Sequence, residues 1–295
     1  FDDRVIGNPK HFASVERKII HVDIDPSSIS KRVRVDVPIV GNVKDVLADL
    51  SAQYEAASAE HKPASIAKWW EQVETWRGKE CLKFANSDEV IKPQFVVEKL
   101  WEVTGGDAFV TSDVGQHQMW AAQYLRFDRP NRWLTSGGAG TMGYGVPAAI
   151  GAQIAYPDRT VACVSGDASV LMNIQELSTA TQHRAPVKVV LCNNGYMGMV
   201  RQWQELIHGG RYSHSYNASL PDFVALARAF GWGAARVEDP AQLDAALAEC
   251  LAHDGPYFLD VAVTAQENCF PMMPAGHGHH KMMLAEGVWY QDETT

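Results

Sequence analysis

Basic residues are in short supply in this chain, and long apolar runs are absent from it. Its 295 residues include 26 Lys and Arg against 35 Asp and Glu, which gives a formal net charge of −9. Because phosphate binding needs a basic face, this balance argues against nucleic acid as the main partner. No stretch approaches the run of about 18 apolar residues that a membrane-spanning helix requires, so no membrane partner is expected.

Cysteine is scarce and scattered, with five residues and no CxxC pair. Such a set argues against a disulfide framework and against a cysteine zinc site. Cys163 and Cys192 lie inside apolar runs typical of buried strands, where cysteine acts as a small hydrophobic residue. The pattern suits a reducing compartment, and we expect a cytoplasmic protein. Since the sequence begins at Phe1 rather than Met, we also expect it to be part of a longer chain.

What the sequence does contain is an apolar content of 46%, enough for a sizeable core. From Lys92 onward, apolar runs alternate with helical stretches, which predicts an α/β fold with a doubly wound parallel sheet. In such sheets the ligand lies beyond the carboxyl ends of the strands. The predicted strands are Ala108–Ser112, Thr160–Ser165, Val187–Asn193 and Tyr257–Val263. The predicted helices cover residues 147–155, 173–182, 220–230 and 241–253.

Four parts are expected along the chain. Residues 1–50 contain a strand, Lys18–Asp25, that ends in acidic residues, where α/β sheets place ligand contacts. Residues 51–90 are interpreted as a linker with a helix whose tryptophans serve packing. Residues 91–270 form the main domain, and residues 271–295 form a C-terminal tail.

Two neighbouring strands carry the chemistry. One ends in Gly166-Asp167-Ala168-Ser169 and the next ends in Asn193-Asn194. They therefore deliver a carboxylate and a carboxamide to one edge of the sheet, and Mg²⁺ prefers such oxygen ligands. Gly166 lets the backbone approach a phosphate, and the helix start after Ser169 favours an anion. A lone Gly-Asp would indicate a turn, but the paired motifs predict a diphosphate clamp bridged by a metal.

These paired motifs resemble the signature of the thiamine-diphosphate enzymes. The resemblance implies that Asp167 and Asn194 bind Mg²⁺ together with the backbone carbonyl of Tyr196, and that Ala168 and Ser169 belong to the same cofactor site. The segment Asp113–Ala122 narrows the resemblance to the acetohydroxyacid synthases. In that family this segment holds the diphosphate end of the cofactor, which here implies Val114, Gly115, Gln116 and His117.

The glycine-rich segment Ser136–Gly143 is also similar to that family. The resemblance implies that Met142 wedges the cofactor into a bent shape and that the backbone of Gly140 and Met142 faces its aminopyrimidine ring. Without this context, Met142 would be interpreted as core filler. The triplet Gln202-Trp203-Gln204 implies that Trp203 lines the pocket for the second ketoacid; the alternative is a tryptophan on an amphipathic helix.

The first residues match the family's middle domain. There Arg4 would neighbour the second ketoacid, whose carboxylate suits the forked donors of a guanidinium, and Asp3 would lie near it and the flavin. Asp23 and Ile24 resemble the strand end over the adenosine part of FAD. The family usually has aspartate at the position of Asn42, whose carboxamide can still accept a hydrogen bond.

The resemblance implies carboligation of pyruvate with a second 2-ketoacid, pyruvate or 2-ketobutyrate, to give acetolactate or acetohydroxybutyrate in branched-chain amino-acid biosynthesis. FAD would have a non-redox role. In the family the active site forms between subunits, so a homodimer or homotetramer is expected, with a small regulatory subunit as a further partner. The catalytic glutamate of the family lies in an N-terminal domain not found in this sequence, and we expect the chain alone to be inactive.

Three alternatives remain at this point. One is another thiamine-diphosphate-dependent decarboxylase, oxidase or carboligase, such as pyruvate oxidase. A second is a non-catalytic cofactor-binding fragment. The third, a plain dinucleotide-binding domain, is disfavoured because no GxGxxG follows any predicted strand.

Overall fold

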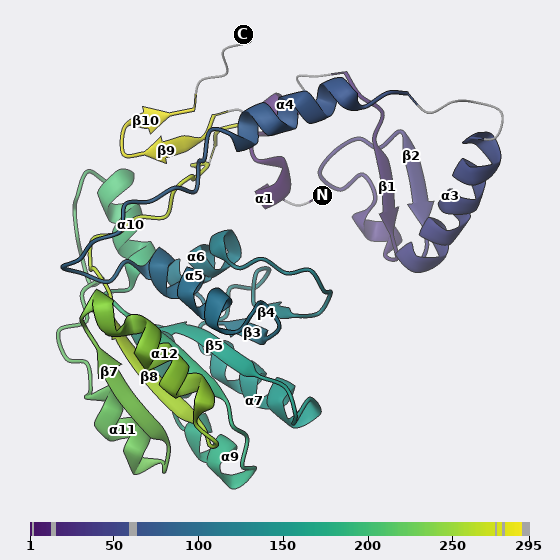
Figure 1. Cartoon of the computed structure of the whole chain (residues 1–295). Coiled ribbons are helices and arrows are strands. Elements are labelled where there is room, and N and C mark those ends of the chain that lie inside the picture. Colours follow the sequence, from purple (N-terminus) through teal and green to yellow (C-terminus); the bar gives the residue numbers. More distant parts are fainter. Residues whose placement is uncertain (2, 13–15, 59–63, 275, 279–280, 291–295) are drawn as a thin grey trace. The chain divides into compact units, whose positions relative to one another are not determined.

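The computed structural model describes residues 1, 3–12, 16–58, 64–274, 276–278 and 281–290. The chain forms two compact units (Figure 1). One consists of Phe1–Cys81 with Phe270–Thr295, and the other of Leu82–Cys269. Within the described ranges, no helix is both long and apolar enough to cross a membrane.

The larger unit is built on a six-stranded sheet in the order β4-β3-β5-β6-β8-β7, and all of its strand pairs are parallel. This confirms the predicted α/β fold with a doubly wound parallel sheet. The strands are β3 (Phe109–Ser112), β4 (Trp133–Thr135), β5 (Val161–Gly166), β6 (Lys188–Asn193), β7 (Gly233–Val237) and β8 (Tyr257–Ala262).

The inner strands are buried along almost their whole length and are mainly apolar, because both faces of the sheet are covered. Successive side chains of a strand point to opposite faces, so Val164 belongs to one hydrophobic cluster and Cys163 to the other. Gly166 at the end of β5 pairs with Cys192 near the end of β6. The two predicted ligand-bearing strands therefore end together at one edge.

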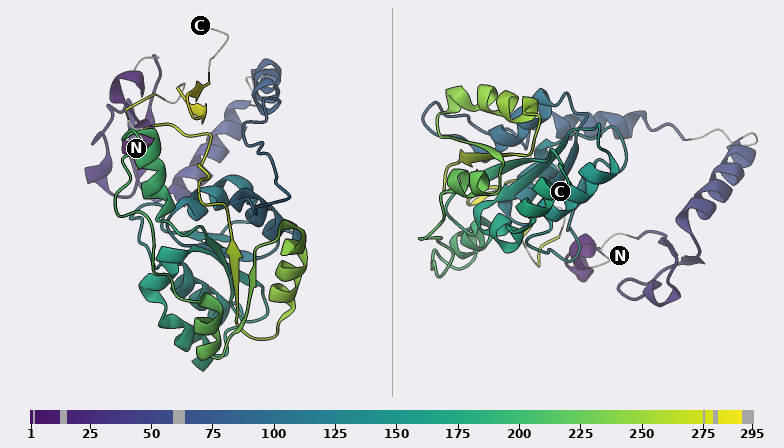
Figure 2. Two further views of the ribbon diagram at one scale, coloured as in Figure 1. Left: turned by 90° about the vertical axis from the view of Figure 1, so that its left-hand side faces the viewer. Right: turned by 90° about the horizontal axis from the view of Figure 1, so that it is seen from below.

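Two layers of helices cover the sheet, as Figure 2 shows from two further sides. The helix residues in the hydrophobic cluster of Val164 come from one layer, and those in the cluster of Cys163 come from the other. The first layer comprises α5 (Pro93–Val103), α6 (Gln116–Tyr124) and α12 (Leu243–Ala252). The second comprises α7 (Gly145–Ala155), α9 (Glu176–Gln182) and α11 (Phe223–Ala229). The short α8 (Asp167–Val170) directly follows the carboxyl end of β5, and α10 (Gly198–Leu206) begins four residues after β6 has ended.

The structure differs from the sequence prediction at several element boundaries and in two strands. Strands β4 and β7 were not predicted, because these short edge strands lack the long apolar run of the inner ones. The helix predicted from residue 173 begins only at Glu176, since α8 and a 3₁₀ turn, Leu171–Asn173, precede it. Asn173 instead donates from Nδ2 to the carbonyl of Gly143 at 2.8 Å.

The smaller unit contains a parallel pair, β1 (Ile20–Asp23) and β2 (Val37–Val40), which places a strand where the acidic strand was predicted. Its helices are α1 (Asp3–Ile6), α2 (Pro9–Phe12), α3 (Val43–Ser58) and α4 (Ala67–Arg77). An antiparallel hairpin of β9 (Met283–Ala285) and β10 (Val288–Trp289) lies in the C-terminal segment.

The tryptophans expected to pack are largely exposed on α4. Trp69, Trp70 and Trp76 have 59%, 52% and 38% of their surface exposed. Trp69 meets Trp76 edge to face, with ring centroids 5.5 Å apart. Apart from this ring contact, the packing role of the three tryptophans remains a prediction.

Candidate active site

A cavity of about 110 Å³ lies at the carboxyl edge of the large sheet. The segments that follow β3, β5 and β6 line this cavity, as expected for a ligand site in a parallel sheet. The predicted site residues among its lining are Val114, Gly115, Gln116, His117, Met142, Gly166, Asp167, Ala168, Ser169, Asn194 and Tyr196.

Other lining residues escaped the sequence prediction. Trp120 is one turn of helix beyond Gln116, so the helical period of α6 was a usable signal for it. Met199 and Val200 line the cavity from the first turn of α10. Their apolar character gave no such signal, because Met and Val at these positions are equally typical of core packing.

The two strand-end motifs contact each other directly. Asp167 is 1% exposed, and its Oδ2 accepts a hydrogen bond from Gly195 N at 2.7 Å. Gly195 lies between Asn194 and Tyr196 and adopts φ +72°, a conformation that favours glycine. Asn217 donates to the other carboxylate oxygen of Asp167 at 2.8 Å. The three predicted metal ligands thus lie on segments that are hydrogen-bonded together.

The electrostatics of Asp167 suit a cation. Burial raises the pKa of Asp167 to about 6, against the opposing effect of hydrogen bonds from Gly195, Ala168, Asn217 and Asn194. A buried carboxylate without a counter-charge is costly, and a divalent cation would compensate it. A carboxylate, a carboxamide and a backbone carbonyl form the hard oxygen donor set that Mg²⁺ prefers. The residues present therefore fit a magnesium ion.

His117 provides a buried polar atom in the same cavity. The side chain is 6% exposed, and its Nε2 has no hydrogen-bond partner within the described residues. Burial lowers the pKa of His117 to about 3, so the ring is neutral near pH 7. A Cβ on Gly166 would lie 2.6 Å from its Nδ1, and one on Gly115 would lie 2.5 Å from its Cε1. Both glycines are thus needed to admit the ring, which leaves Nε2 for a bound group.

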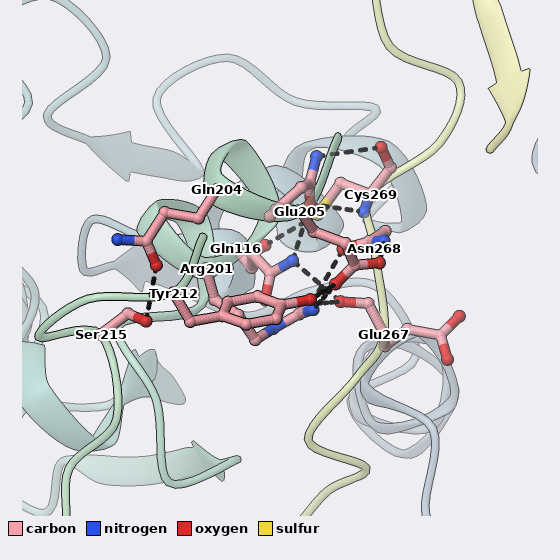
Figure 3. A network of polar contacts seen from close by, with 10 residues as sticks. Gln116, Arg201, Gln204, Glu205, Tyr212, Ser215, Glu267, Asn268 and Cys269 are labelled. Carbon is pink, nitrogen blue, oxygen red and sulfur yellow. Dashed lines mark hydrogen bonds and ion pairs between the residues drawn. The ribbon is translucent and has the colours of Figure 1, made fainter. Parts of the chain in front are cut away.

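Gln116 connects the cavity to a polar network (Figure 3). Its Nε2 donates to Gln202 Oε1 at 2.7 Å and to the carbonyl of Glu267 at 2.9 Å. Arg201 is 2% exposed and donates from Nη2 to the same carbonyl at 2.7 Å and to Asn268 Oδ1 at 2.8 Å. Its Nη1 pairs with Glu205. These bonds hold α6, α10 and the segment after β8 together around one wall of the cavity.

Two predicted residues of the large unit do not line this cavity. Gly140 adopts φ +66° in an exposed part of the loop before Met142. Trp203 lies on α10 beyond the lining residues and is 43% exposed. Their roles remain predictions.

The remaining predicted residues belong to the smaller unit. Gly41 N donates to the carbonyl of Asp23 at 3.0 Å, so Asp23 and Asn42 lie at the same end of the β1–β2 pair. Asn42 Oδ1 accepts from Lys44 N at 2.9 Å at the start of α3, and Ile24 is 74% exposed. The side chains of Asp3 and Arg4 lie outside the part of the chain that the structure describes.

A doubly wound sheet that brings a buried aspartate and an asparagine together is the arrangement that the resemblance to the thiamine-diphosphate enzymes predicts. Residues 113–261 match the C-terminal TPP binding domain of thiamine pyrophosphate enzymes, and residues 1–50 match their central domain. The chain belongs to the thiamine pyrophosphate enzyme family. Membership sets aside the plain dinucleotide-binding domain.

Individual relatives narrow the class to acetolactate synthase large subunits, with which the chain is homologous. It is 49% identical to the acetolactate synthase isozyme 3 large subunit of Escherichia coli (strain K12), over 97% of this chain and 50% of that protein. It is 45% identical to the acetolactate synthase large subunit of Haemophilus influenzae, over 100% of this chain and 51% of that protein. It is 45% identical to the acetolactate synthase large subunit of Parasynechococcus marenigrum, over 96% of this chain and 45% of that protein. The chain spans about half the length of these relatives.

Proposed function

We propose that this chain forms the part of an acetolactate synthase that binds thiamine pyrophosphate and Mg²⁺. The reaction joins pyruvate to a second 2-ketoacid, pyruvate or 2-ketobutyrate. The observation that carries the proposal is the hydrogen bond from Gly195 to Asp167 inside the cavity. It joins the two strand-end motifs, so the carboxylate of Asp167 lies against the segment that carries Asn194 and Tyr196.

The residues of the cavity have distinct roles in this proposal. Asp167, Asn194 and the carbonyl of Tyr196 would hold Mg²⁺, and the metal would bind the diphosphate group. When bound, thiamine pyrophosphate would supply the carbanion chemistry for decarboxylation and ligation. Met142 would pack against the cofactor, and Val200 would add an apolar contact from another part of the cavity lining.

The second ketoacid and the flavin are assigned to residues outside the cavity lining. Arg4 would bind the acceptor carboxylate and Trp203 would contact its side chain. Asp23 and Asn42 support a non-redox FAD site, because both lie at the carboxyl end of a parallel strand pair. The intact protein would be a cytoplasmic homodimer or homotetramer with a small regulatory subunit.

The test is acetolactate formation from pyruvate by the full-length protein supplied with Mg²⁺, thiamine pyrophosphate and FAD. Acetolactate should appear with the unchanged protein and be lost in Asp167→Ala. Asp158→Ala is the matched control, since Asp158 is an exposed aspartate just before the start of the same strand, β5. Acetaldehyde or acetyl phosphate in place of acetolactate would retain the cofactor site and reject the synthase assignment.

A further inference from the structure

Asp113 is a buried carboxylate to which the proposed function gives no role. It follows β3 directly and is 0% exposed. Its Oδ1 accepts hydrogen bonds from Gly143 N at 2.7 Å and from Val114 N at 2.9 Å. Its Oδ2 faces Gly145 N at 3.3 Å and Ser165 Oγ at 3.4 Å. All of these donors are neutral, so Asp113 is held by hydrogen bonds rather than by an ion pair.

Two of these donors lie at the start of α7. This helix begins at Gly145, and its N-cap residue Tyr144 makes no side-chain capping bond. The first amide groups of a helix lack partners inside the helix, and a carboxylate there satisfies them and complements the helix dipole. Asp113 performs this capping from a position 32 residues earlier in the sequence.

The peptide groups next to Met142 are held from two sides. Asp113 accepts the N–H of Gly143, and Asn173 Nδ2 donates to the carbonyl of Gly143 at 2.8 Å. Gly143 adopts φ +91°, and a Cβ there would lie 2.7 Å from Asn173 Nδ2. The residue that directly follows Met142 is therefore fixed at both its amide and its carbonyl.

We propose that Asp113 is a positioning residue that fixes the Met142 loop in the shape that receives thiamine pyrophosphate. The role rests on the proposed function, which places Met142 against the cofactor. A loop held in its bound shape before binding loses little conformational entropy when the ligand arrives, and this increases affinity. Without Asp113, part of the binding free energy would be spent on ordering the loop.

The first measurement is hydrogen exchange of the full-length protein without cofactor, followed by mass spectrometry of peptides covering residues 139–147. In Asp113→Ala, exchange in these peptides should be about tenfold to a hundredfold faster, the range expected for losing buried hydrogen bonds to a charged group. Asp222→Ala is the control. Asp222 caps α11 by accepting from Ala225 N at 2.9 Å, so its loss removes a similar bond without touching the Met142 loop.

The second measurement is calorimetric binding of thiamine pyrophosphate in the presence of Mg²⁺. Asp113→Ala should bind about tenfold more weakly at unchanged stoichiometry, and Asp113→Asn, which keeps one acceptor oxygen, should lie between it and the unchanged protein. Asp222→Ala should bind normally. If Asp113→Ala does not fold, Asp113→Asn decides the question by the same two measurements.

The outcomes separate this inference from the proposed function. If the unchanged protein does not bind thiamine pyrophosphate, the proposed function fails. If it binds the cofactor but a folded Asp113 variant shows unchanged exchange in residues 139–147, or unchanged affinity, the positioning role of Asp113 is refuted. Faster exchange together with weaker binding, both absent from Asp222→Ala, supports it.

Discussion

Replacing Gly198 by alanine should damage the cavity although it adds a single methyl group. Gly198 opens α10 and lines the cavity. A Cβ at this position would lie 2.2 Å from Gln116 Oε1 and 2.8 Å from Asn194 Nδ2. Contacts below 3.0 Å are essentially never observed for a real Cβ, so both amide groups have to move, Gln116 by the larger amount.

The cost follows from what holds Gln116 in place. Its Nε2 bonds to Gln202 Oε1 at 2.7 Å and to the carbonyl of Glu267 at 2.9 Å. Moving the amide weakens both bonds, at about 1 kcal/mol each, and overpacking a buried site adds a penalty of similar size. Gly198→Ala should therefore reduce the free energy of unfolding by about 2–3 kcal/mol. Because Asn194 is a proposed metal ligand, its displacement should also weaken Mg²⁺-dependent cofactor binding.

The assay is urea unfolding of the full-length protein, combined with calorimetric titration of thiamine pyrophosphate at several Mg²⁺ concentrations. Gly151→Ala is the control, because Gly151 is an exposed glycine inside α7 whose added Cβ would meet nothing within 4 Å. It should be neutral or stabilise by up to about 1 kcal/mol through helix propensity. Equal stability and equal cofactor affinity in Gly198→Ala and the unchanged protein would refute the packing described for Gln116.

Three further changes probe the site and the core. Asn217→Ala removes the 2.8 Å hydrogen bond to Asp167 Oδ1, and the Mg²⁺ concentration needed for cofactor binding should rise about tenfold, as titration calorimetry would show. His117→Gln should make the free energy of unfolding depend less on pH below pH 6.5. Burial lowers the pKa of His117 from 6.5 to about 3, so below pH 6.5 the unfolded chain takes up a proton that the folded chain does not. About 2 kcal/mol of stability should be lost between pH 6.5 and 5 in the unchanged protein and retained in the variant, measured by urea unfolding. Leu247→Ala, at a fully buried position of α12, should cost about 2–5 kcal/mol in the same unfolding assay.

Each of the three has a result that would contradict it. An unchanged Mg²⁺ requirement in Asn217→Ala would mean that the hydrogen bond from Asn217 does not orient Asp167 for metal binding. If the free energy of unfolding falls equally between pH 6.5 and 5 in the unchanged protein and in His117→Gln, the folded protein takes up a proton on His117 as readily as the unfolded chain does. A loss below 1 kcal/mol in Leu247→Ala would mean that the core relaxes around the deletion.

The sequence was informative where a local pattern has a direct structural meaning. The mainly apolar run 160–165 predicted β5, because a strand covered on both faces is rich in apolar residues on both of its sides. Asp167 and Asn194 could be placed at one edge because parallel neighbouring strands end on the same side. The edge strands β4 and β7 carry no such run, and the sequence did not reveal them.

What the sequence by itself determined was the α/β fold, its main strands and the identity of the strand-end motifs. Only the tertiary structure decided which groups hold these motifs in place. Asn217 bonds to Asp167, Gln116 to the carbonyl of Glu267, and Asp113 to Gly143, across separations of 50, 151 and 30 residues. Hydropathy periods report which face of an element is buried, whereas such bonds depend on the paths of loops between elements. For this reason the partners of the site residues could be read only from the folded chain.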